Sequence, residues 1–216
     1  AEAGGRDSLA ARLDDPQLRP RIIAEMTENL RRRGGAHSLL ITGGRDSTIR
    51  GKRLDEIARG WDMTPIDAAL RIIANGGASV ASFNMNERDI VNFMRQEFIF
   101  TDSDGSGGHP RKYGTYPRFF REYVERQQVM PIERGVQRSS SGPARILGLA
   151  NRGLLAPGHF ADVIVFDRAT FADRSTYEQP TLLAGGMKFV VVNGVIAIDD
   201  GRYTGALAGR VLTRSR

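Results

Sequence analysis

The sequence contains no cysteine, so disulfide bonds and thiolate metal ligands are excluded within this chain. Histidine is scarce as well, with one residue each at positions 37, 109 and 159. No run of 18 apolar residues occurs, and the sequence therefore predicts no membrane-spanning helix. The composition is otherwise that of a globular protein, and 216 residues are enough to bury a core in one large domain or two small ones.

Acidic residues are fewer than basic ones, and very few of the basic residues are lysine. The formal net charge is +6, and only positions 52, 112 and 188 among the 31 basic residues are lysine. A basic balance can indicate a nucleic-acid partner. Here the arginines are scattered through amphipathic segments and do not cluster with aromatic residues, which favours solvated helix faces and no nucleic-acid partner. A non-catalytic basic binding module stays the alternative, and it predicts binding that weakens steeply with salt.

The first part of the chain mixes helical and extended patterns. Apolar side chains recur every four residues from Leu18 to Leu30, which predicts an amphipathic helix over residues 16–32. Thr64 and Asp67 have the spacing of a capping box around Pro65, which predicts the start of another helix. The other elements predicted in this part are a helix at Leu54–Ala58 and strands at Ser38–Thr42 and Ser79–Phe83.

A parallel strand–helix–strand unit is predicted in the middle of the chain. Asn86 can cap a helix over Glu87–Arg95, and the apolar run Phe98–Thr101 after it predicts a buried strand. Together with the strand at Ser79–Phe83 this order is typical of a parallel βαβ unit. Further helices are predicted at Pro117–Gln127, Ile132–Gln137 and Ser141–Leu147.

The sequence pattern changes after about residue 150, where glycines separate short apolar runs. Asn193-Gly194 between two such runs is a strong β-hairpin signal. The sequence therefore predicts a small antiparallel β unit packed on the α/β part, with a domain boundary between residues 1–149 and residues 150–216. The strands predicted in this unit are Ala161–Phe166, Phe189–Val192 and Val195–Ile198.

Residues 102–118 gather an acid, an imidazole, a guanidinium and a phenol behind the predicted strand at Phe98–Thr101. The side chains concerned are those of Asp104, His109, Arg111 and Tyr113. A carboxylate at the end of a strand, followed by a glycine-rich loop, is where α/β enzymes place catalytic groups. The alternative interpretation is that Asp104 has only a structural role in a turn, because Asp-Gly is common in turns. A calcium loop starting at Asp102 is disfavoured because its twelfth position lacks the required glutamate.

Four segments resemble the D-aminoacylase (N-acyl-D-amino-acid deacylase) family of the amidohydrolase superfamily. The His-Pro-Arg-x-Tyr-Gly-Thr-x-Pro-Arg run is specific to that family, whereas the Gly-rich segment after residue 152 is shared across the superfamily. The segments are Ser103-Asp104-Gly105, His109 to Arg118, Gly153 to Asp167, and Val192 to Val195 with a later Thr204-Gly205 and Gly209 to Leu212. The resemblance covers most of the chain from about residue 50 onward.

For the fold, the resemblance implies an α/β protein that is the C-terminal portion of a TIM-like (β/α)8 metallo-dependent hydrolase barrel plus part of a small β-sandwich. Residues 1–149 would be the barrel portion with an inserted helical segment, and residues 150–216 would be the sandwich portion. The strands at Ser79–Phe83 and Phe98–Thr101 would then be the last two strands of the barrel.

For the cofactor, the resemblance implies zinc held by a His-x-His pair, two later histidines and a cysteine. None of these ligands has a match here, and the chain begins without methionine, so we expect the C-terminal part of a longer enzyme. The expected partner is the N-terminal half of the same enzyme, as a separate or cleaved chain that carries most of the zinc ligands. Alone, the chain is expected to be inactive.

For the site, the resemblance implies that Asp104 takes a proton from the zinc-bound water and gives it to the leaving amine. Asp104 is also a candidate metal ligand, and we expect it to face the barrel mouth. Arg111 resembles the arginine that binds the substrate α-carboxylate, and His109 and Tyr113 are expected beside the substrate. The implied reaction is hydrolysis of an N-acyl-D-amino acid to a carboxylate and a D-amino acid. A hydantoinase- or dihydroorotase-like activity on cyclic amides is the alternative.

Overall fold

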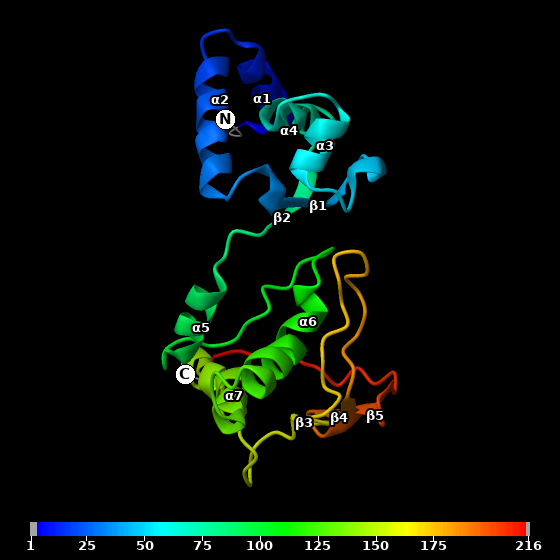
Figure 1. The fold of residues 1–216 in the computed structure, drawn as a ribbon. Coiled ribbons are helices and arrows are strands. Elements are labelled where there is room, and N and C mark those ends of the chain that lie inside the picture. The colour runs from blue at the N-terminus through cyan, green and yellow to red at the C-terminus, as the bar shows by residue number, and fades with distance from the viewer. Residues whose placement is uncertain (1–3, 215–216) are drawn as a thin grey trace. The chain divides into compact units, whose positions relative to one another are not determined.

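The computed structural model describes residues 4–214, apart from the side chains of residues 6, 7, 9 and 10. The chain divides into two compact units, Ala1–Met85 and Asn86–Arg216, each of which is described by itself (Figure 1). The predicted boundary between residues 149 and 150 falls inside the second unit and stays a prediction. Within the described part of the chain, every helix is too short or too polar to cross a membrane.

The described part of the first unit combines α-helices with a two-stranded sheet. Thr64 accepts a hydrogen bond from the Asp67 N–H at 3.1 Å, so the predicted helix start is confirmed. The core consists of apolar side chains from both helices and strands, including Ile41, Ile57 and Ala68. The elements are α1 (Gly5–Asp14), α2 (Arg19–Arg32), η1 (Ala36–Ser38), β1 (Leu39–Gly44), η2 (Ser47–Ile49), α3 (Leu54–Gly60), α4 (Pro65–Ala74) and β2 (Ala78–Ser82).

The two strands of this unit lie within two residues of their predicted positions, but they pair antiparallel. Leu39 lies opposite Ser82, and Gly44 lies opposite Ala78. Neighbouring strands of a (β/α)8 barrel are parallel, so this pair is not the arrangement expected of barrel strands. The described residues form a mixed α/β structure in which no closed barrel is seen.

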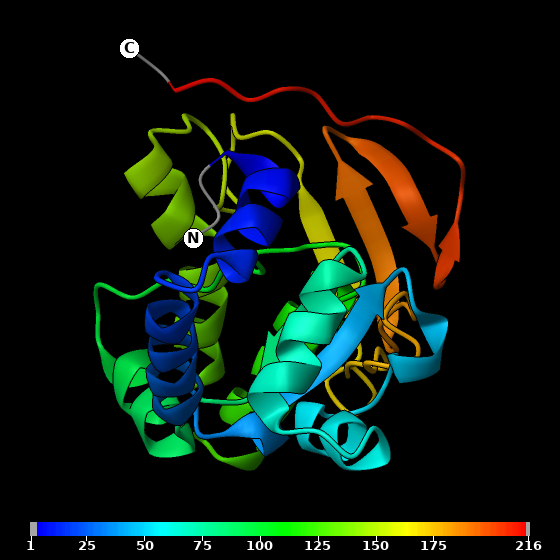
Figure 2. The same ribbon diagram turned by 90° about the horizontal axis from the view of Figure 1, so that it is seen from above.

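The second unit places helices beside a four-stranded antiparallel sheet, in the order β3-β4-β5-β6 (Figures 1 and 2). The predicted antiparallel β unit is thereby confirmed. Its hairpin turns at Asn193-Gly194, where both residues have positive φ, as a type I′ turn requires. The elements are α5 (Glu87–Arg95), α6 (Arg111–Arg118), η3 (Phe119–Arg126), α7 (Ile132–Ser139), α8 (Ser141–Leu147), β3 (Val163–Phe166), β4 (Met187–Val192), β5 (Val195–Asp199) and β6 (Arg202–Tyr203).

The predicted strand at Phe98–Thr101 is wrong. This segment is irregular, the Phe98 side chain is 73% exposed, and no described strand lies alongside it. An apolar run becomes a strand only when a neighbouring strand takes up its backbone hydrogen bonds. Here the Thr101 N–H instead points to the carbonyl of Arg138, at 3.5 Å. The predicted parallel βαβ unit is therefore absent from the described residues, although Asn86 does cap α5 as predicted.

The loop predicted between residue 101 and the helix at Pro117 is also partly wrong, because the chain is already helical from Arg111. The helix α6 begins at Arg111, six residues before the start predicted for the helix Pro117–Gln127. Pro117 lacks the N–H that would bond to the carbonyl of Tyr113, and the helix continues as the π-helical segment η3 from Phe119. The helix passes through the motif that resembles the deacylase family, so the motif side chains project from helical turns.

Aromatic rings hold η3 against the sheet. Phe120 contacts Phe166 and Phe171, with ring centroids 5.6 Å and 6.1 Å apart, and these two rings pack at 4.6 Å. Tyr123 is buried beside them, and burial together with the hydrogen bond that its hydroxyl donates to the Glu87 carboxylate raises the pKa of the phenol to about 12. This cluster fixes the C-terminal end of the helix that carries the motif.

Candidate functional site

Three of the four predicted site residues lie together at the start of α6. The Arg111 guanidinium forms an ion pair with Asp104, with Nη2 2.7 Å from Oδ2. The backbone N–H of Arg111 donates to Nδ1 of His109 at 3.1 Å. Acid, cation and imidazole therefore form one connected cluster, as their closeness in sequence suggests.

Asp104 lies in the loop before α6 with its carboxylate 84% exposed. Its φ of 42° is in the left-handed region, which aspartate tolerates better than most residues. The carboxylate faces solvent, and the described residues supply no barrel mouth for it to face. Asp102, two residues earlier, accepts the Ser103 N–H at 2.7 Å in a local turn.

Arg111 is half-buried, and its donors are only partly used. Besides Asp104, the guanidinium reaches the Ser106 hydroxyl at 3.4 Å. Its Nε is buried and has no acceptor among the described residues. A guanidinium is suited to a planar anion such as a carboxylate, which can accept two parallel hydrogen bonds.

His109 is held as a neutral imidazole. Because Nδ1 accepts the Arg111 N–H, the ring proton of the neutral form is on Nε2, which points to the Tyr177 hydroxyl at 3.4 Å. The two rings meet edge to face at 5.2 Å. Burial lowers the pKa of His109 from its ordinary value of 6.5, and Arg111 lowers it further, whereas Asp104 acts in the opposite direction.

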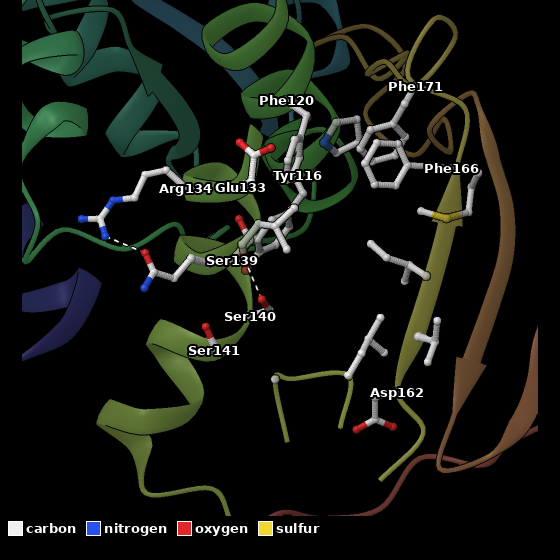
Figure 3. Close-up of a pocket in the computed structure, with 18 of the residues that line it drawn as sticks. Tyr116, Phe120, Glu133, Arg134, Ser139, Ser140, Ser141, Asp162, Phe166 and Phe171 are labelled. Atoms are coloured by element: carbon white, nitrogen blue, oxygen red, sulfur yellow. Dashed lines mark hydrogen bonds between the residues drawn. The ribbon is translucent and has the colours of Figure 1, made fainter. Parts of the chain in front are cut away.

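Tyr113 is not part of this cluster. The helical turn directs it away from Arg111, to a cavity of about 1100 Å³ between α6, η3, α7 and β3. Figure 3 shows Tyr116 and Phe120 from the helical side of this cavity and Phe166 from the sheet side. Most of the surface is apolar, with serines 139–141 along α7 and α8. Tyr113 therefore serves a different surface of α6 from Arg111.

Sequence analysis missed the extended segment Asp173–Tyr177, which lies against α6. Ser175 is buried and donates a hydrogen bond to the Pro110 carbonyl at 2.9 Å. Asp173 pairs with Arg118 at 3.4 Å. The segment is about 65 residues from the motif in sequence, and its continuous polar run, Asp-Arg-Ser-Thr, carries no signal of this contact.

A zinc site is not formed by the described residues alone. No group of three or more histidine, cysteine, aspartate or glutamate side chains comes close enough among them to hold a metal ion. A structural or catalytic zinc requires at least three such ligands from the protein. The described part of the chain therefore does not fit a resident zinc by itself.

Comparison with known sequences relates the chain to a family. Residues 99–198 match the model of the amidohydrolase family. The chain is 37% identical to the N-acyl-D-glutamate deacylase of Alcaligenes xylosoxydans xylosoxydans over 76% of its own length, and 36% identical to the D-aminoacylase of the same organism over 77%. It covers only 34% and 35% of these two enzymes, so it spans about a third of their length.

Solved structures agree with the sequence comparison. A crystal structure of D-aminoacylase matches 82% of this chain with a TM-score of 0.74 and 35% identity, and the chain covers 38% of it. The N-acyl-D-glutamate deacylase of Bordetella bronchiseptica, solved with zinc and a phosphonate inhibitor, matches 83% with a TM-score of 0.70 and 32% identity, and the chain covers 39% of it. The chain is thus related to the amidohydrolase family, and it is homologous to D-aminoacylase and N-acyl-D-glutamate deacylase over part of their length.

Proposed function

We propose that this chain is the C-terminal part of a zinc-dependent deacylase that hydrolyses N-acyl-D-amino acids to a carboxylate and a D-amino acid. The proposal is carried by one observation, that a chain homologous to deacylases holds its candidate site residues in one cluster. The chain is related to deacylases of this class, and the motif that resembles their family brings Asp104, His109 and Arg111 into one cluster. Zinc is bound in one of the related structures, and its ligands here would lie mostly on the rest of the enzyme.

In the proposed reaction Arg111 binds the α-carboxylate of the substrate through its guanidinium. Asp104 accepts a proton from the attacking water and passes it to the leaving nitrogen. The ion pair between these two residues must open for both to act. An exposed pair of this kind contributes only about 0–1 kcal/mol, so a substrate carboxylate can replace Asp104 on Arg111.

The proposed partner is the remaining part of the same enzyme, which would complete the (β/α)8 barrel and the β-sandwich. The matched part of the chain covers only 34% and 35% of the two relatives. The second unit also leaves apolar surface uncovered among the described residues, both in the large cavity and on the sheet, where Ile164, Val165 and Ile196 are about half exposed. Surface of this kind marks a place where further polypeptide packs.

Complementation tests the proposal directly. The purified chain is expected to show no deacylase activity and to bind zinc weakly, whereas adding the N-terminal polypeptide of the same enzyme restores both. Activity is measured on a panel of N-acetyl-D-amino acids and cyclic amides, and zinc by metal analysis. Hydrolysis by the isolated chain with tightly bound zinc would contradict the half-enzyme proposal, and a preference for cyclic amides would contradict the substrate class.

Removing the guanidinium of Arg111 is expected to weaken substrate binding. In the complemented enzyme, Arg111→Ala should raise KM for N-acetyl-D-amino acids about 10–100-fold, because charge-assisted hydrogen bonds to the carboxylate are lost. Arg126→Ala is the matched control, since Arg126 is an exposed arginine on η3 that pairs with Glu122. Equal KM values for the two variants would show that Arg111 does not bind the carboxylate.

A further inference from the structure

The segment Asp173–Tyr177, between β3 and β4, runs along α6 in the direction opposite to the helix. Every second residue of it makes a contact, which is the spacing of an extended backbone. Asp173 reaches Arg118 at the end of α6, and Ser175 reaches the carbonyl of Pro110 just before the helix begins. Tyr177 then meets His109, one residue further back. The segment therefore follows the helix from its last turn to its first.

The two elements approach so closely that a side chain larger than glycine's between them would displace a neighbour. Gly114 is buried, and a Cβ at this position would lie 2.7 Å from the Ser175 hydroxyl and 3.3 Å from the Cβ of Asp173. Side chains at Asp173 and Ser175 thus rest on the backbone of α6. The segment therefore contacts α6 at its middle as well as near both of its ends.

Hydrogen bonds carry this positioning to Arg111. Tyr177 contacts Nε2 of His109 at 3.4 Å, and Nδ1 of the same ring accepts the Arg111 N–H at 3.1 Å. The imidazole therefore bridges the segment and the backbone of the first residue of α6. Since the guanidinium of Arg111 extends from that residue, the bridge determines where the carboxylate-binding group begins.

We propose that Tyr177 is a positioning residue, which acts through His109 to hold Arg111 where it can bind the substrate carboxylate. The inference rests on the proposed function, because it assigns a substrate-binding role to Arg111. It adds a residue from a distant part of the sequence, together with Ser175, to the machinery of the site. His109 then has a defined task, as the link between Tyr177 and Arg111.

Tyr177→Phe tests this proposal, because it removes the hydroxyl and keeps the ring. In the complemented enzyme, the variant is expected to raise KM for N-acetyl-D-amino acids about 2–10-fold, as the loss of one hydrogen bond does, with kcat within about twofold of the parent. Tyr203→Phe on β6 is the matched control, since its hydroxyl lies 3.4 Å from the Ala206 carbonyl, a contact outside the cluster, and it should leave KM unchanged. An unchanged KM for Tyr177→Phe overturns the proposal.

A double-mutant cycle separates positioning from a general structural effect. If Tyr177 acts through Arg111, Tyr177→Phe should have no further effect on KM in an Arg111→Ala background. The same KM increase in both backgrounds, or a parallel loss of kcat, overturns the proposal. Ser175→Ala serves as a second variant should Tyr177→Phe fold poorly, with the same expectation in both backgrounds.

The cycle also distinguishes this inference from the proposed function. An effect of Arg111→Ala without any effect of Tyr177→Phe or Ser175→Ala overturns the positioning role alone. No effect of Arg111→Ala overturns the carboxylate-binding role of Arg111, and the positioning role falls with it.

Discussion

Asp104→Asn is expected to lower kcat of the complemented enzyme about 10²–10⁴-fold, the usual range for loss of a general acid–base group. Asparagine has nearly the same shape as aspartate but cannot take up a proton from water or return one to the leaving nitrogen. The substitution also removes the negative partner of Arg111, so KM should stay the same or fall. The expected pattern is therefore a large loss in kcat with substrate binding retained.

Asp102→Asn is the matched control for this prediction. Asp102 is also an exposed carboxylate in the same loop, and it serves a local turn to the Ser103 N–H. The kcat of the Asp102→Asn variant should remain within a few-fold of that of the parent enzyme. Metal analysis of the Asp104 variant should give zinc content near normal. If kcat of Asp104→Asn matches that of Asp102→Asn, Asp104 is not the proton carrier.

The second large effect concerns stability. Gly186→Ala is expected to destabilise the second unit by about 3 kcal/mol or more, because it combines backbone strain with a steric clash. Gly186 has a φ of 78°, and a Cβ would lie 2.4 Å from the backbone nitrogen of Phe171 and 2.5 Å from the carbonyl carbon of Thr170. Backbone atoms cannot swing aside as a flexible side chain can.

Gly194→Ala provides the control, because its φ of 83° is similar and no described atom lies within 4 Å of its Cβ position. That variant should lose only about 1–2 kcal/mol of unfolding free energy, which is the cost of the left-handed conformation alone. Urea unfolding of both variants, followed by circular dichroism, measures the difference. Similar unfolding midpoints for the two would mean that the contact between Gly186 and Phe171 relaxes without cost.

Features encoded within a few residues could be predicted from the sequence. Thr64 and Asn86 cap helices through hydrogen bonds to residues two or three positions away, and Asn193-Gly194 forms its turn from its own backbone preferences. The closeness of Asp104 to Arg111 belongs to the same class, since they are seven positions apart, although the ion pair between them was not predicted. Local chemistry decides these features, so local sequence reveals them.

Features that depend on distant partners could not be predicted in the same way. The run Phe98–Thr101 has the composition of a strand, but the described residues supply no strand to pair with it. The strands β1 and β2 were found, whereas their antiparallel pairing depends on residues about 40 positions apart. Tyr177 was missed because a lone tyrosine 68 residues after His109 carries no local signal of that contact.

The close approach of Gly114 to Ser175 has an evolutionary consequence. With no room for a methyl group on the helix and a hydroxyl already touching it from the segment, neither position can grow independently. Substitutions at the two positions should therefore be correlated among descendants of this gene. A larger side chain at one position should be tolerated only where the side chain at the other position has become smaller. The absence of a Cβ atom at Gly114 thus limits which residues can replace Ser175, 61 positions further along the chain.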